Sequence, residues 1–484
     1  MAEAPLTSIR PRARPAPPAP GPTRVPPNAR TEMEALIDRI GPGGTVSLHL
    51  SEIDGDRVVL SRDAESGMPP ASVTKAVTTL YALDTLGLDH RFDTRVVATG
   101  PVTDGVLDGD IALVGGGDPT LSTDDLATLA ADLKAAGLRR VNGQFLVYGD
   151  ALPYEDEIDD SQLDHLGYNP SISGLNLNYN RVHFQWARTG TDYDITLDAR
   201  TAQHRPNVTI ATMNVADRSL PIYEYEDGGE VDNWSVARRA LGDGGSRWLP
   251  VRRPALYAGD VFRTMARSHG IMLRAARRVR EEPVGTTLAR LESAPLETIA
   301  RDMLRYSTNL TAEVLGLSAT TALSGRPADL PASARAMNGW LGTRYGVTAS
   351  FVDHSGLGDA SRITAREMVK LLSAPGARET LIPVLKVHDL KDPEGRPMPR
   401  YPASVAAKTG TLNFVSTLAG YVRTAEGRDL AFAIFCGDLD RREAAKLVND
   451  ERPDGASYYN GRAKNLQQRL LQRWGLTYAD YVAE

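Results

Sequence analysis

The sequence predicts an α+β protein of several domains, in which an antiparallel sheet is flanked by helices. The chain has 484 residues, which is more than one hydrophobic core usually supports, so two or three domains are expected. Strand-like alternation and helix-like spacing of apolar residues are strong near both ends of the chain. The middle of the chain reads instead as short, more polar strands, which is typical of separate small units.

The composition excludes several classes of protein. The formal net charge of -6 is small for this length and argues against bulk nucleic-acid binding. No run of about 18 apolar residues occurs, so we expect no transmembrane segment. The single cysteine, Cys436, cannot form an internal disulfide or a Cys/His metal site of ordinary spacing. We therefore expect neither a metal nor a cofactor.

The N-terminal segment predicts disorder. The first ten residues, MAEAPLTSIR, lack an apolar core and do not read as a signal peptide. Residues 11–30 contain eight prolines and four arginines, so we expect residues 1–30 to be a disordered, proline-rich lead-in. A mature exported protein and a cytoplasmic protein with a tail are both compatible with this start.

The first elements follow in order after this lead-in. Residues 31–40 predict a helix, and GGTVSLHLSEI and RVVLSRD predict a hairpin around IDGDR. A second helix starts near Ser72, because Val73 and three later apolar residues recur at spacings of three and four. Residues 92–284 hold short strands and one helix, STDDLATLAADLKAAG, which suggests an α/β unit. The run GGGDPT within them lacks the spacing of a nucleotide-binding loop and is interpreted as a turn.

The C-terminal part is strongly patterned. TTLARLES predicts a strand, and residues 295–322 predict two helices broken around Ser307–Asn309. TAREMVKLL predicts another helix. Three antiparallel strands are then expected in SVAAKTGT, VSTLAGYVRT and DLAFAIFCG, the last two joined by the short loop AEGR. A closing amphipathic helix, RAKNLQQRLLQRW, can cover one face of this sheet.

Ser72 and Lys75 are the first candidates for chemistry. They are three residues apart near a helix start, so they share a helix face and the amine can reach the serine oxygen. Ordinary structure offers another reading of the same pair. Serine is a favoured helix cap, and lysine is a good helix former that usually faces water.

Two further motifs favour the catalytic interpretation of Ser72 and Lys75. Ser307 and Asn309 form a Ser-x-Asn motif between helices, and Lys408, Thr409 and Gly410 form Lys-Thr-Gly on a strand. Each alone is ordinary capping or strand sequence. Together with Ser-x-x-Lys, in this order, they match the signature of serine penicillin-binding enzymes.

The residue types fit a nucleophile activated by lysine. Of the eight histidines, His354 in DHSGLG is the one nearest a plausible nucleophile, and a histidine triad fits poorly. Lys75 can act as a base if burial, and the nearby cation of Lys408, lower its pKa. Ser307 would relay a proton to the leaving amine, and Asn309 would bond both Lys75 and the substrate amide.

The Lys-Thr-Gly strand would bind the substrate. Lys408 and Thr409 offer charge and a hydroxyl to a terminal carboxylate. Gly410 would let a peptide approach the strand edge and pair with it as an added strand. The backbone N–H groups of Ser72 and Thr411 would hold the oxyanion.

With these motifs, the chain resembles the serine-type D-Ala-D-Ala carboxypeptidases of the class C, low-molecular-mass penicillin-binding protein 4 type, peptidase family S13. The resemblance runs from about residue 30 to residue 475. It is also carried by five further segments, namely GGGDPTLS (115–122), LNLNYNRV (175–182), ESAPLETIARDMLRYSTN (292–309), DHSGLG (353–358) and KTGTLNFVSTLAGYV (408–422).

The resemblance implies a transpeptidase-like, β-lactamase-type catalytic domain made of residues 31–91 and 285–484, with two small domains inserted in residues 92–284. It implies a periplasmic hydrolase that cleaves the terminal D-Ala from peptidoglycan stem peptides, with D,D-endopeptidase activity on crosslinks. β-Lactams would acylate it, and a homodimer is allowed. The implied site has Ser72 as nucleophile, Lys75 as base, and Ser307, Asn309, Lys408, Thr409, Gly410 and Thr411 around them.

One departure and three alternatives remain open. Some relatives carry an arginine after the Ser-Gly-Leu-x segment, where it helps to hold the free end of the stem diaminopimelate. Here Asp359 stands there, so either Arg362 substitutes or the stem peptide is held differently. A β-lactamase, a non-catalytic peptidoglycan scaffold and an Ser-x-x-Lys esterase are the other functions to weigh. Penicillin labelling that depends on Ser72 would discriminate among them.

Overall fold

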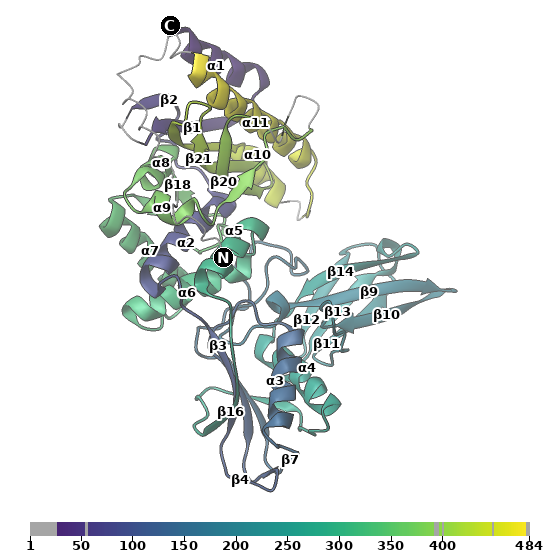
Figure 1. Cartoon of the computed structure of the whole chain (residues 1–484). Helices are drawn as coiled ribbons and strands as arrows, with labels where there is room; N and C mark the ends of the chain where they lie inside the picture. Colours follow the sequence, from purple (N-terminus) through teal and green to yellow (C-terminus); the bar gives the residue numbers. More distant parts are fainter. Residues whose placement is uncertain (1–26, 54–56, 392–395, 399–400, 448–449, 481–484) are drawn as a thin grey trace, which may run out of the picture.

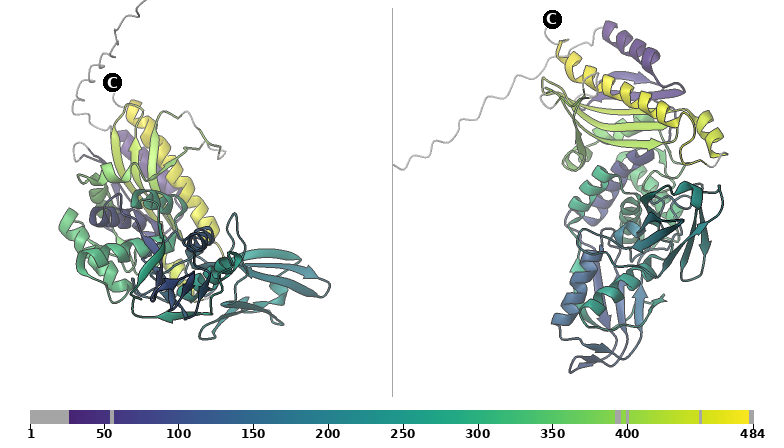
Figure 2. Two further views of the ribbon diagram at one scale, coloured as in Figure 1. Left: turned by 60° about the horizontal axis from the view of Figure 1, so that its bottom comes forward. Right: turned by 90° about the vertical axis from the view of Figure 1, so that its right-hand side faces the viewer.

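The computed structural model describes residues 27–53, 57–391, 396–398, 401–447 and 450–480. The molecule is elongated, with a large sheet and its helices at one end and the middle of the chain at the other (Figures 1 and 2). Of the predicted disordered lead-in, residues 1–26 lie outside the described part. Residues 27–30 correct that prediction, because helix α1 spans Pro27–Ile40. Proline suits the first helical turn, where its missing N–H is not needed.

A six-stranded antiparallel sheet joins the two ends of the chain. Its order is β19-β20-β21-β22-β1-β2, so the C-terminal strands continue directly into the N-terminal hairpin. The pairing of β22 with β1 runs from Gly437 opposite Thr45 to Leu430 opposite Glu52. The strands are β1 (Thr45–Glu52), β2 (Val58–Arg62), β19 (Lys386–His388), β20 (Ser404–Leu412), β21 (Val415–Arg423) and β22 (Asp429–Gly437).

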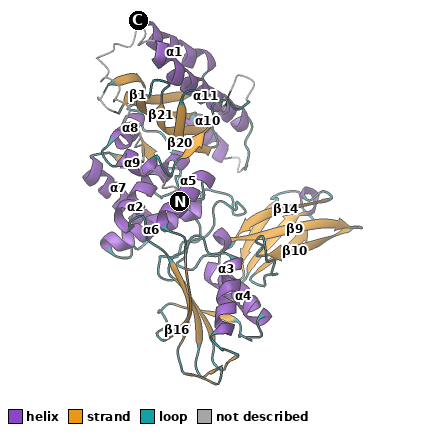
Figure 3. Ribbon diagram, in the orientation of Figure 1, coloured by secondary structure: helices purple, strands orange, loops and turns teal. Residues whose placement is uncertain are grey.

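Helices cover both faces of this sheet (Figure 3). On one face α1 and α11 (Ala456–Asp480) bury Met33, Leu466 and Trp474 against strand residues such as Phe432. The other face packs against a group of helices. They are α2 (Thr74–Leu86), α5 (Leu296–Tyr306), α6 (Asn309–Ser324), α7 (Leu330–Tyr345), α8 (Ala365–Ser373) and α9 (Ala377–Leu381).

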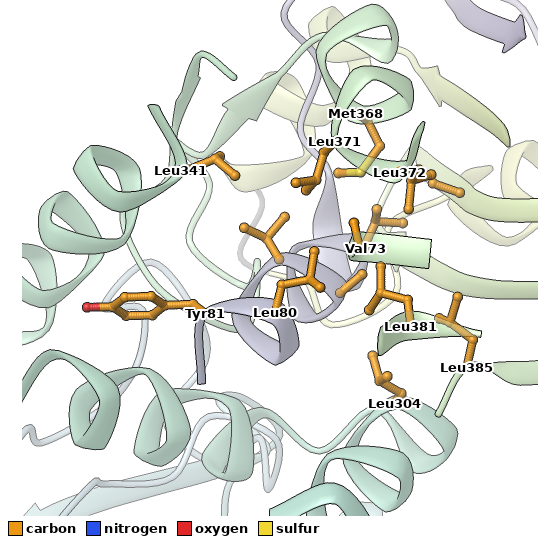
Figure 4. Close-up of a cluster of buried hydrophobic side chains, with 14 of the residues drawn as sticks. Val73, Leu80, Tyr81, Leu304, Leu341, Met368, Leu371, Leu372, Leu381 and Leu385 are labelled. Atoms are coloured by element: carbon orange, nitrogen blue, oxygen red, sulfur yellow. The ribbon is translucent and has the colours of Figure 1, made fainter. Parts of the chain in front are cut away.

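Helix α2 lies at the centre of the helical group (Figure 4). Its predicted apolar face is buried, and so is the rest of the helix from Thr74 to Leu83. The predicted apolar spacing therefore marks only one of the faces that α2 buries, because helices and sheet surround this helix. A short 3₁₀ turn, η1 (Ala71–Val73), precedes it and carries Ser72. Burying such a helix places the charged Lys75, 0% exposed, in the protein interior.

The middle of the chain forms a second body around a five-stranded mixed sheet. The strand order is β15-β8-β6-β3-β16, with β6, β8 and β15 parallel to one another. Helices α3 and α4 pack on it around Phe145 and Phe262. The elements are β3 (Asp93–Ala98), β6 (Ile111–Gly115), α3 (Thr123–Ala135), β8 (Phe145–Tyr148), α4 (Pro254–Ser268), β15 (Ala276–Val279) and β16 (Thr286–Glu292).

Smaller sheets complete the structure. The strands β9, β10 and β14 form one antiparallel arm, and β11, β12 and β13 form a second small sheet beside it (Figure 1). Their bounds are β9 (Arg181–Thr189), β10 (Asp192–Asp198), β14 (Gly244–Pro250), β11 (Ala211–Ala216), β12 (Tyr223–Asp227) and β13 (Asp232–Ala237). Two minor sheets remain. One has the three strands β4 (Val102–Thr103), β5 (Val106–Leu107) and β7 (Arg140–Val141), and the other is the pair β17 (Ala349–Ser350) and β18 (Arg362–Ile363).

Most predicted elements are present, and several helices were not predicted. The break between α5 and α6 and the hairpin of β21 and β22 lie where expected. GGGDPT closes β6 and leads through a loop to α3, as its interpretation as a turn requires. Four of the helices were not predicted from the sequence, namely α4, α7, α9 and α10 (Leu439–Lys446). Within the described part of the chain, no helix has both the length and the hydropathy needed to cross a membrane.

Candidate active site

The three predicted motifs meet at one place in the fold. Turn η1 carries Ser72, the first turn of α2 carries Lys75, and the break between α5 and α6 carries Ser307 and Asn309. Strand β20 carries Lys408. Hydrogen bonds link them in two groups, Lys75 with Ser72 and Asn309, and Lys408 with Ser307.

Lys75 is the centre of the first group. Its Nζ lies 3.0 Å from Ser72 Oγ, 2.7 Å from Asn309 Oδ1 and 2.8 Å from the carbonyl oxygen of Ser355. Burial lowers the pKa of Lys75 to about 8, although the carboxylates of Glu313 and Asp353 act in the opposite direction. An amine with this pKa has about a tenth of its population neutral at pH 7, as a general base requires.

The predicted influence of Lys408 on Lys75 needs correction. Burial is the main cause of the lowered pKa, as predicted, but the strongest neighbouring charges on Lys75 are carboxylates. These two carboxylates, of Glu313 and Asp353, fix the DHSGLG loop by accepting hydrogen bonds from its backbone. Glu313 accepts from the N–H groups of His354 and Ser355, both at 2.8 Å, and Asp353 accepts from those of Gly356 and Gly358.

Sequence reasoning missed the roles of Glu313 and Asp353. Both side chains are almost completely buried, and burial raises the pKa of each. A signal was present, because Glu313 interrupts an otherwise apolar helix in TAEVLGL. A buried acid normally has a partner, and here the partners are the loop amides that place the Ser355 carbonyl next to Lys75.

Ser307 and Lys408 form the second group. Ser307 adopts the left-handed conformation with φ 59°, which ends α5 and turns the chain into α6. Lys408 Nζ donates to Ser307 Oγ at 3.0 Å and to the carbonyl of Thr409 at 2.7 Å. Burial lowers the pKa of Lys408, and the charges of Lys75 and Lys386 lower it further.

Gly410 is required by the close contact between β20 and η1. A Cβ at this position would lie 2.2 Å from Thr417 Oγ1 and 2.9 Å from both Ala71 Cβ and the Pro70 carbonyl. Thr417 Oγ1 itself donates to that carbonyl at 2.7 Å. The glycine thus lets the strand carrying Lys-Thr-Gly pack directly against the turn that carries the serine.

The edge of β20 beyond β19 is the predicted peptide-binding edge. Strand β19 pairs with Val405, Ala406 and Ala407, and its pairing stops there. The Lys-Thr-Gly motif begins at the next residue. Thr409 and Thr411 are exposed on this part of the strand, and Thr411 lines the same pocket as Ser72.

His354 is not placed to act as a base. It is fully buried, and burial lowers its pKa to about 3, so the ring is neutral. Its Nε2 lies 2.8 Å from Ser333 Oγ and its Nδ1 lies 3.3 Å from Met337 Sδ. The prediction that a histidine triad fits poorly agrees with this arrangement.

A pocket of about 330 Å³ lies over Ser72. Ser72, Ser307, Asn309 and Thr411 line one side of it. A loop of the middle region forms another side, and Asn309 Nδ2 donates to the Tyr168 carbonyl in that loop at 2.9 Å. This contribution of the middle region was not predicted. The loop residues at the pocket are Ser161, Gln162, Leu163, Leu166 and Tyr168.

Arg442 and Lys446 of α10, rather than Arg362, are the basic residues at this pocket. Arg362 donates back to the carbonyls of Asp359, at 2.5 Å, and Ser361, and the lining of the pocket in the described structure does not include it. Asp359 pairs with Arg442 at 2.7 Å and with Lys446. These cations hold the pKa of Asp359 below its usual range, against the effect of its burial.

An ion pair joins the two bodies at the edge of the pocket. Glu451, which lies between α10 and α11 and lines the pocket, accepts from Arg247 Nη2 of β14 at 3.0 Å. His165 Nε2 lies 3.5 Å from the same carboxylate oxygen. We call these three residues the Glu451 bridge.

Comparison with known proteins identifies the family. Residues 33–451 match the family described as D-Ala-D-Ala carboxypeptidase 3 (S13). The chain belongs to this family. It is 30% identical over 440 residues to a D-alanyl-D-alanine carboxypeptidase of Actinomadura sp. (strain R39), covering 84% of this chain and 80% of that protein. It is 24% identical over 449 residues to the D-alanyl-D-alanine carboxypeptidase DacB of Haemophilus influenzae, covering 88% and 93%.

The fold agrees with this family. The chain is similar to the crystal structure of penicillin binding protein 4 (dacB) from Haemophilus influenzae, with a TM-score of 0.72 and 21% identity. The similarity covers 91% of this chain and 99% of that one. The predicted fold class and the predicted membership of the S13 peptidases, which are hydrolases, are thereby confirmed.

Proposed function

We propose that the chain is a serine D,D-peptidase that removes the terminal D-Ala of peptidoglycan stem peptides through an acyl-enzyme on Ser72. The observation that carries the proposal is the position of Lys75. Its amine is completely buried, has a lowered pKa, and lies 3.0 Å from Ser72 Oγ. A serine beside such an amine has the base that an alkoxide nucleophile needs.

Acylation begins when Lys75 Nζ takes the proton of Ser72 Oγ. The oxygen attacks the carbonyl carbon of the penultimate D-Ala, and the negative charge develops on the carbonyl oxygen. The N–H groups of Ser72 and Thr411 stabilise that charge, an interaction that typically contributes about 100- to 1,000-fold in rate. Asn309 Oδ1 and the Ser355 carbonyl keep the amine aimed at the serine.

The tetrahedral intermediate then expels the terminal D-Ala. Its amine needs a proton, which Ser307 relays: Ser307 Oγ gives its proton to the amine and receives the proton that Lys75 took from Ser72, while Lys408 Nζ, 3.0 Å away, supports the serine oxygen. Lys75 is then neutral again. Water then attacks the ester, with Lys75 again accepting the proton, and releases the shortened peptide. Thr409 and Lys408 bind the terminal carboxylate of the substrate, and the free edge of β20 pairs with its backbone.

The pocket wall contacts the stem peptide. Arg442 and Lys446 line this wall, each paired with Asp359, and they take the place of Arg362 by exchanging that partner for an acidic group of the stem peptide. The same pocket accepts the stem peptide of a crosslink, which gives the D,D-endopeptidase activity.

We place the enzyme in the periplasm, where its substrate lies. The division into a catalytic domain and two inserted domains stays a prediction, as does a homodimer, which light scattering of the purified protein checks.

Intact-mass spectrometry after incubation with benzylpenicillin tests the proposal. Wild type should gain the mass of one penicillin, and Ser72→Ala should gain none. Adduct-free wild type with the penicillin intact would favour a scaffold. Adduct-free wild type with the penicillin consumed would indicate a β-lactamase. Release of D-Ala from a pentapeptide, measured in parallel, reports on the natural reaction.

A further inference from the structure

A second cavity, of about 170 Å³, lies beside the Ser-x-Asn loop. Three segments that carry the family resemblance converge on it, and the catalytic arrangement does not use the residues that they contribute. Thr120 comes from GGGDPTLS, Tyr179 comes from LNLNYNRV, and Thr298, Asp302, Tyr306 and Thr308 come from residues 292–309. Thr308 lies between the catalytic candidates Ser307 and Asn309, so the cavity and the active-site pocket share this loop.

The backbone around Tyr179 is held in an uncommon conformation. Asn178, Tyr179 and Asn180 all have positive φ, at 49°, 58° and 52°. Such residues persist only where the surroundings fix them. The side chains of Asn178 and Asn180 do so from buried positions. Asn178 bonds to the Thr123 backbone and hydroxyl, and Asn180 bonds to the carbonyl of Ser171. Tyr179, between these two anchors, reaches the cavity.

The cavity offers aromatic rings together with free polar groups. Arg181 lies 5.3 Å over the Tyr179 ring, and Arg305 lies 5.5 Å over the Tyr306 ring, so each ring is supported by a guanidinium. The Tyr179 and Tyr306 hydroxyls and the Asp302 carboxylate have no hydrogen-bond partner among the described residues. All three residues line the same cavity, and Asp302 and Tyr306 raise the pKa of Tyr179 beyond the effect of burial.

We propose that this cavity is a subsite for one sugar ring of the peptidoglycan glycan strand. Aromatic rings with a carboxylate and several hydroxyls suit a neutral ring that has apolar C–H faces and many hydroxyl groups. The inference rests on the proposed function, because the glycan is attached to the N-terminal end of the stem peptide whose other end reacts at Ser72.

The length of the stem peptide limits how far this subsite can lie from Ser72. An extended stem peptide of about four residues spans about 13 Å. The Ser-x-Asn loop contributes to both sites, so a peptide lying over that loop can place its sugar in the cavity while its terminal D-Ala bond lies at Ser72. Binding at both ends would then add to the affinity without altering the chemical step.

Kinetics with two matched substrates test the subsite. One is a pentapeptide ending in D-Ala-D-Ala, and the other is the same pentapeptide attached to the N-acetylglucosamine–N-acetylmuramic acid disaccharide. Wild type should show a KM about threefold to tenfold lower for the glycopeptide, the size of one good aromatic contact. Asp302→Ala and Tyr306→Ala should each reduce this preference and leave the kinetics of the free pentapeptide within about twofold.

Matched controls keep the test specific. Arg301→Ala alters the same helix at a side chain that pairs with Glu297 instead of the cavity, and it should retain the sugar preference. Equal KM values for the two substrates in wild type would overturn the inference, as would equal losses on both substrates in Asp302→Ala. Benzylpenicillin labelling of Ser72 separates the two claims, because a labelled enzyme without a sugar preference disproves only the subsite.

Discussion

The floor and the wall of the active-site pocket are built in different ways. We use the word floor for the charged groups that lie behind Ser72, beneath the lining of the pocket, namely Lys75, Glu313 and Asp353. They are nearly or completely buried, and each bonds to groups fixed by helices or by the DHSGLG loop. The wall consists of a loop of the middle region and of α10, joined by the partly exposed Glu451 bridge. Glu451 is 31% exposed on its side chain, so water screens its pairing.

This difference separates chemistry from substrate selection. Removing charged groups from water shifts their pKa values strongly, which prepares Lys75 to act as a base. Exposed ion pairs change the pKa values of their members less, and each contributes about 0–1 kcal/mol to stability. The positions of these pairs nevertheless set the width of the pocket. Substitutions in the floor should therefore change the rate of acylation, and substitutions in the wall should change mainly the binding of peptides.

The largest effect is expected for Lys75→Met. This variant keeps most of the side-chain volume and removes the base, so acylation by benzylpenicillin should slow by about 100- to 10,000-fold. Stopped-flow measurement with a fluorescent penicillin gives the rate, and thermal unfolding shows whether the fold is kept. A folded Lys75→Met variant that acylates at nearly the wild-type rate would remove lysine from the mechanism.

Gly410→Ala should have the next largest effect. The new Cβ would lie 2.2 Å from Thr417 Oγ1 and 2.9 Å from the Pro70 carbonyl, so β20 and η1 must separate and the N–H groups of Ser72 and Thr411 move apart. We expect acylation to slow by about 100-fold, with a loss of about 1–3 kcal/mol in the free energy of unfolding. Gly339→Ala is the matched control. Nothing lies within 4 Å of its new Cβ in α7, so this variant should be active and stabilised by about 0.5–1 kcal/mol.

Glu313→Gln tests how the charge of Glu313 acts on the pKa of Lys75. Glu313 raises the pKa of Lys75, so replacing its carboxylate by an amide should lower that pKa. The midpoint of the pH dependence of acylation should then move toward lower pH, by up to about one unit. Some stability should be lost, because an amide cannot accept from both loop N–H groups. A midpoint that moves to higher pH would contradict the assigned sign.

The smallest effect is expected in the wall. Glu451→Gln weakens the Glu451 bridge, so KM for a stem pentapeptide should rise by about two- to fivefold, while penicillin acylation stays within about twofold. The exposed pair of Glu297 and Arg301 on α5 serves as control, and Glu297→Gln should leave both quantities unchanged. Equal slowing of acylation and of peptide turnover by Glu451→Gln would mean that wall and floor are not separable.

The sequence predicted the parts of the site that depend on local patterns. Ser-x-x-Lys on a helix start, Ser-x-Asn at a helix break and Lys-Thr-Gly on a strand each combine a short motif with a local element. Five strands of the six-stranded sheet were predicted from alternation near the two chain ends, and β19 was not predicted. Helix α2 was predicted with one buried face, because the spacing of apolar residues identifies one packing face and does not show how many elements surround a helix.

The remaining parts depend on contacts between distant segments. Glu313 and Asp353 act on Lys75 through a loop about 280 residues along the chain from it, and no spacing rule predicts such a contact. The loop around Tyr168 enters the pocket from the middle region, and its contact with Asn309 joins residues 141 positions apart. Arg362 looked suitable from its position after DHSGLG, but its side chain bonds to its own loop.

The pH dependence of Ser72 acylation by benzylpenicillin tests the central claim, that a buried, neutral Lys75 is the base. The rate constant should rise with pH through a midpoint near 8, because Lys75 must lose its proton before it can accept one from Ser72. A rate independent of pH between about 6 and 9, or a midpoint near 6.5 as for an ordinary histidine, would contradict the account.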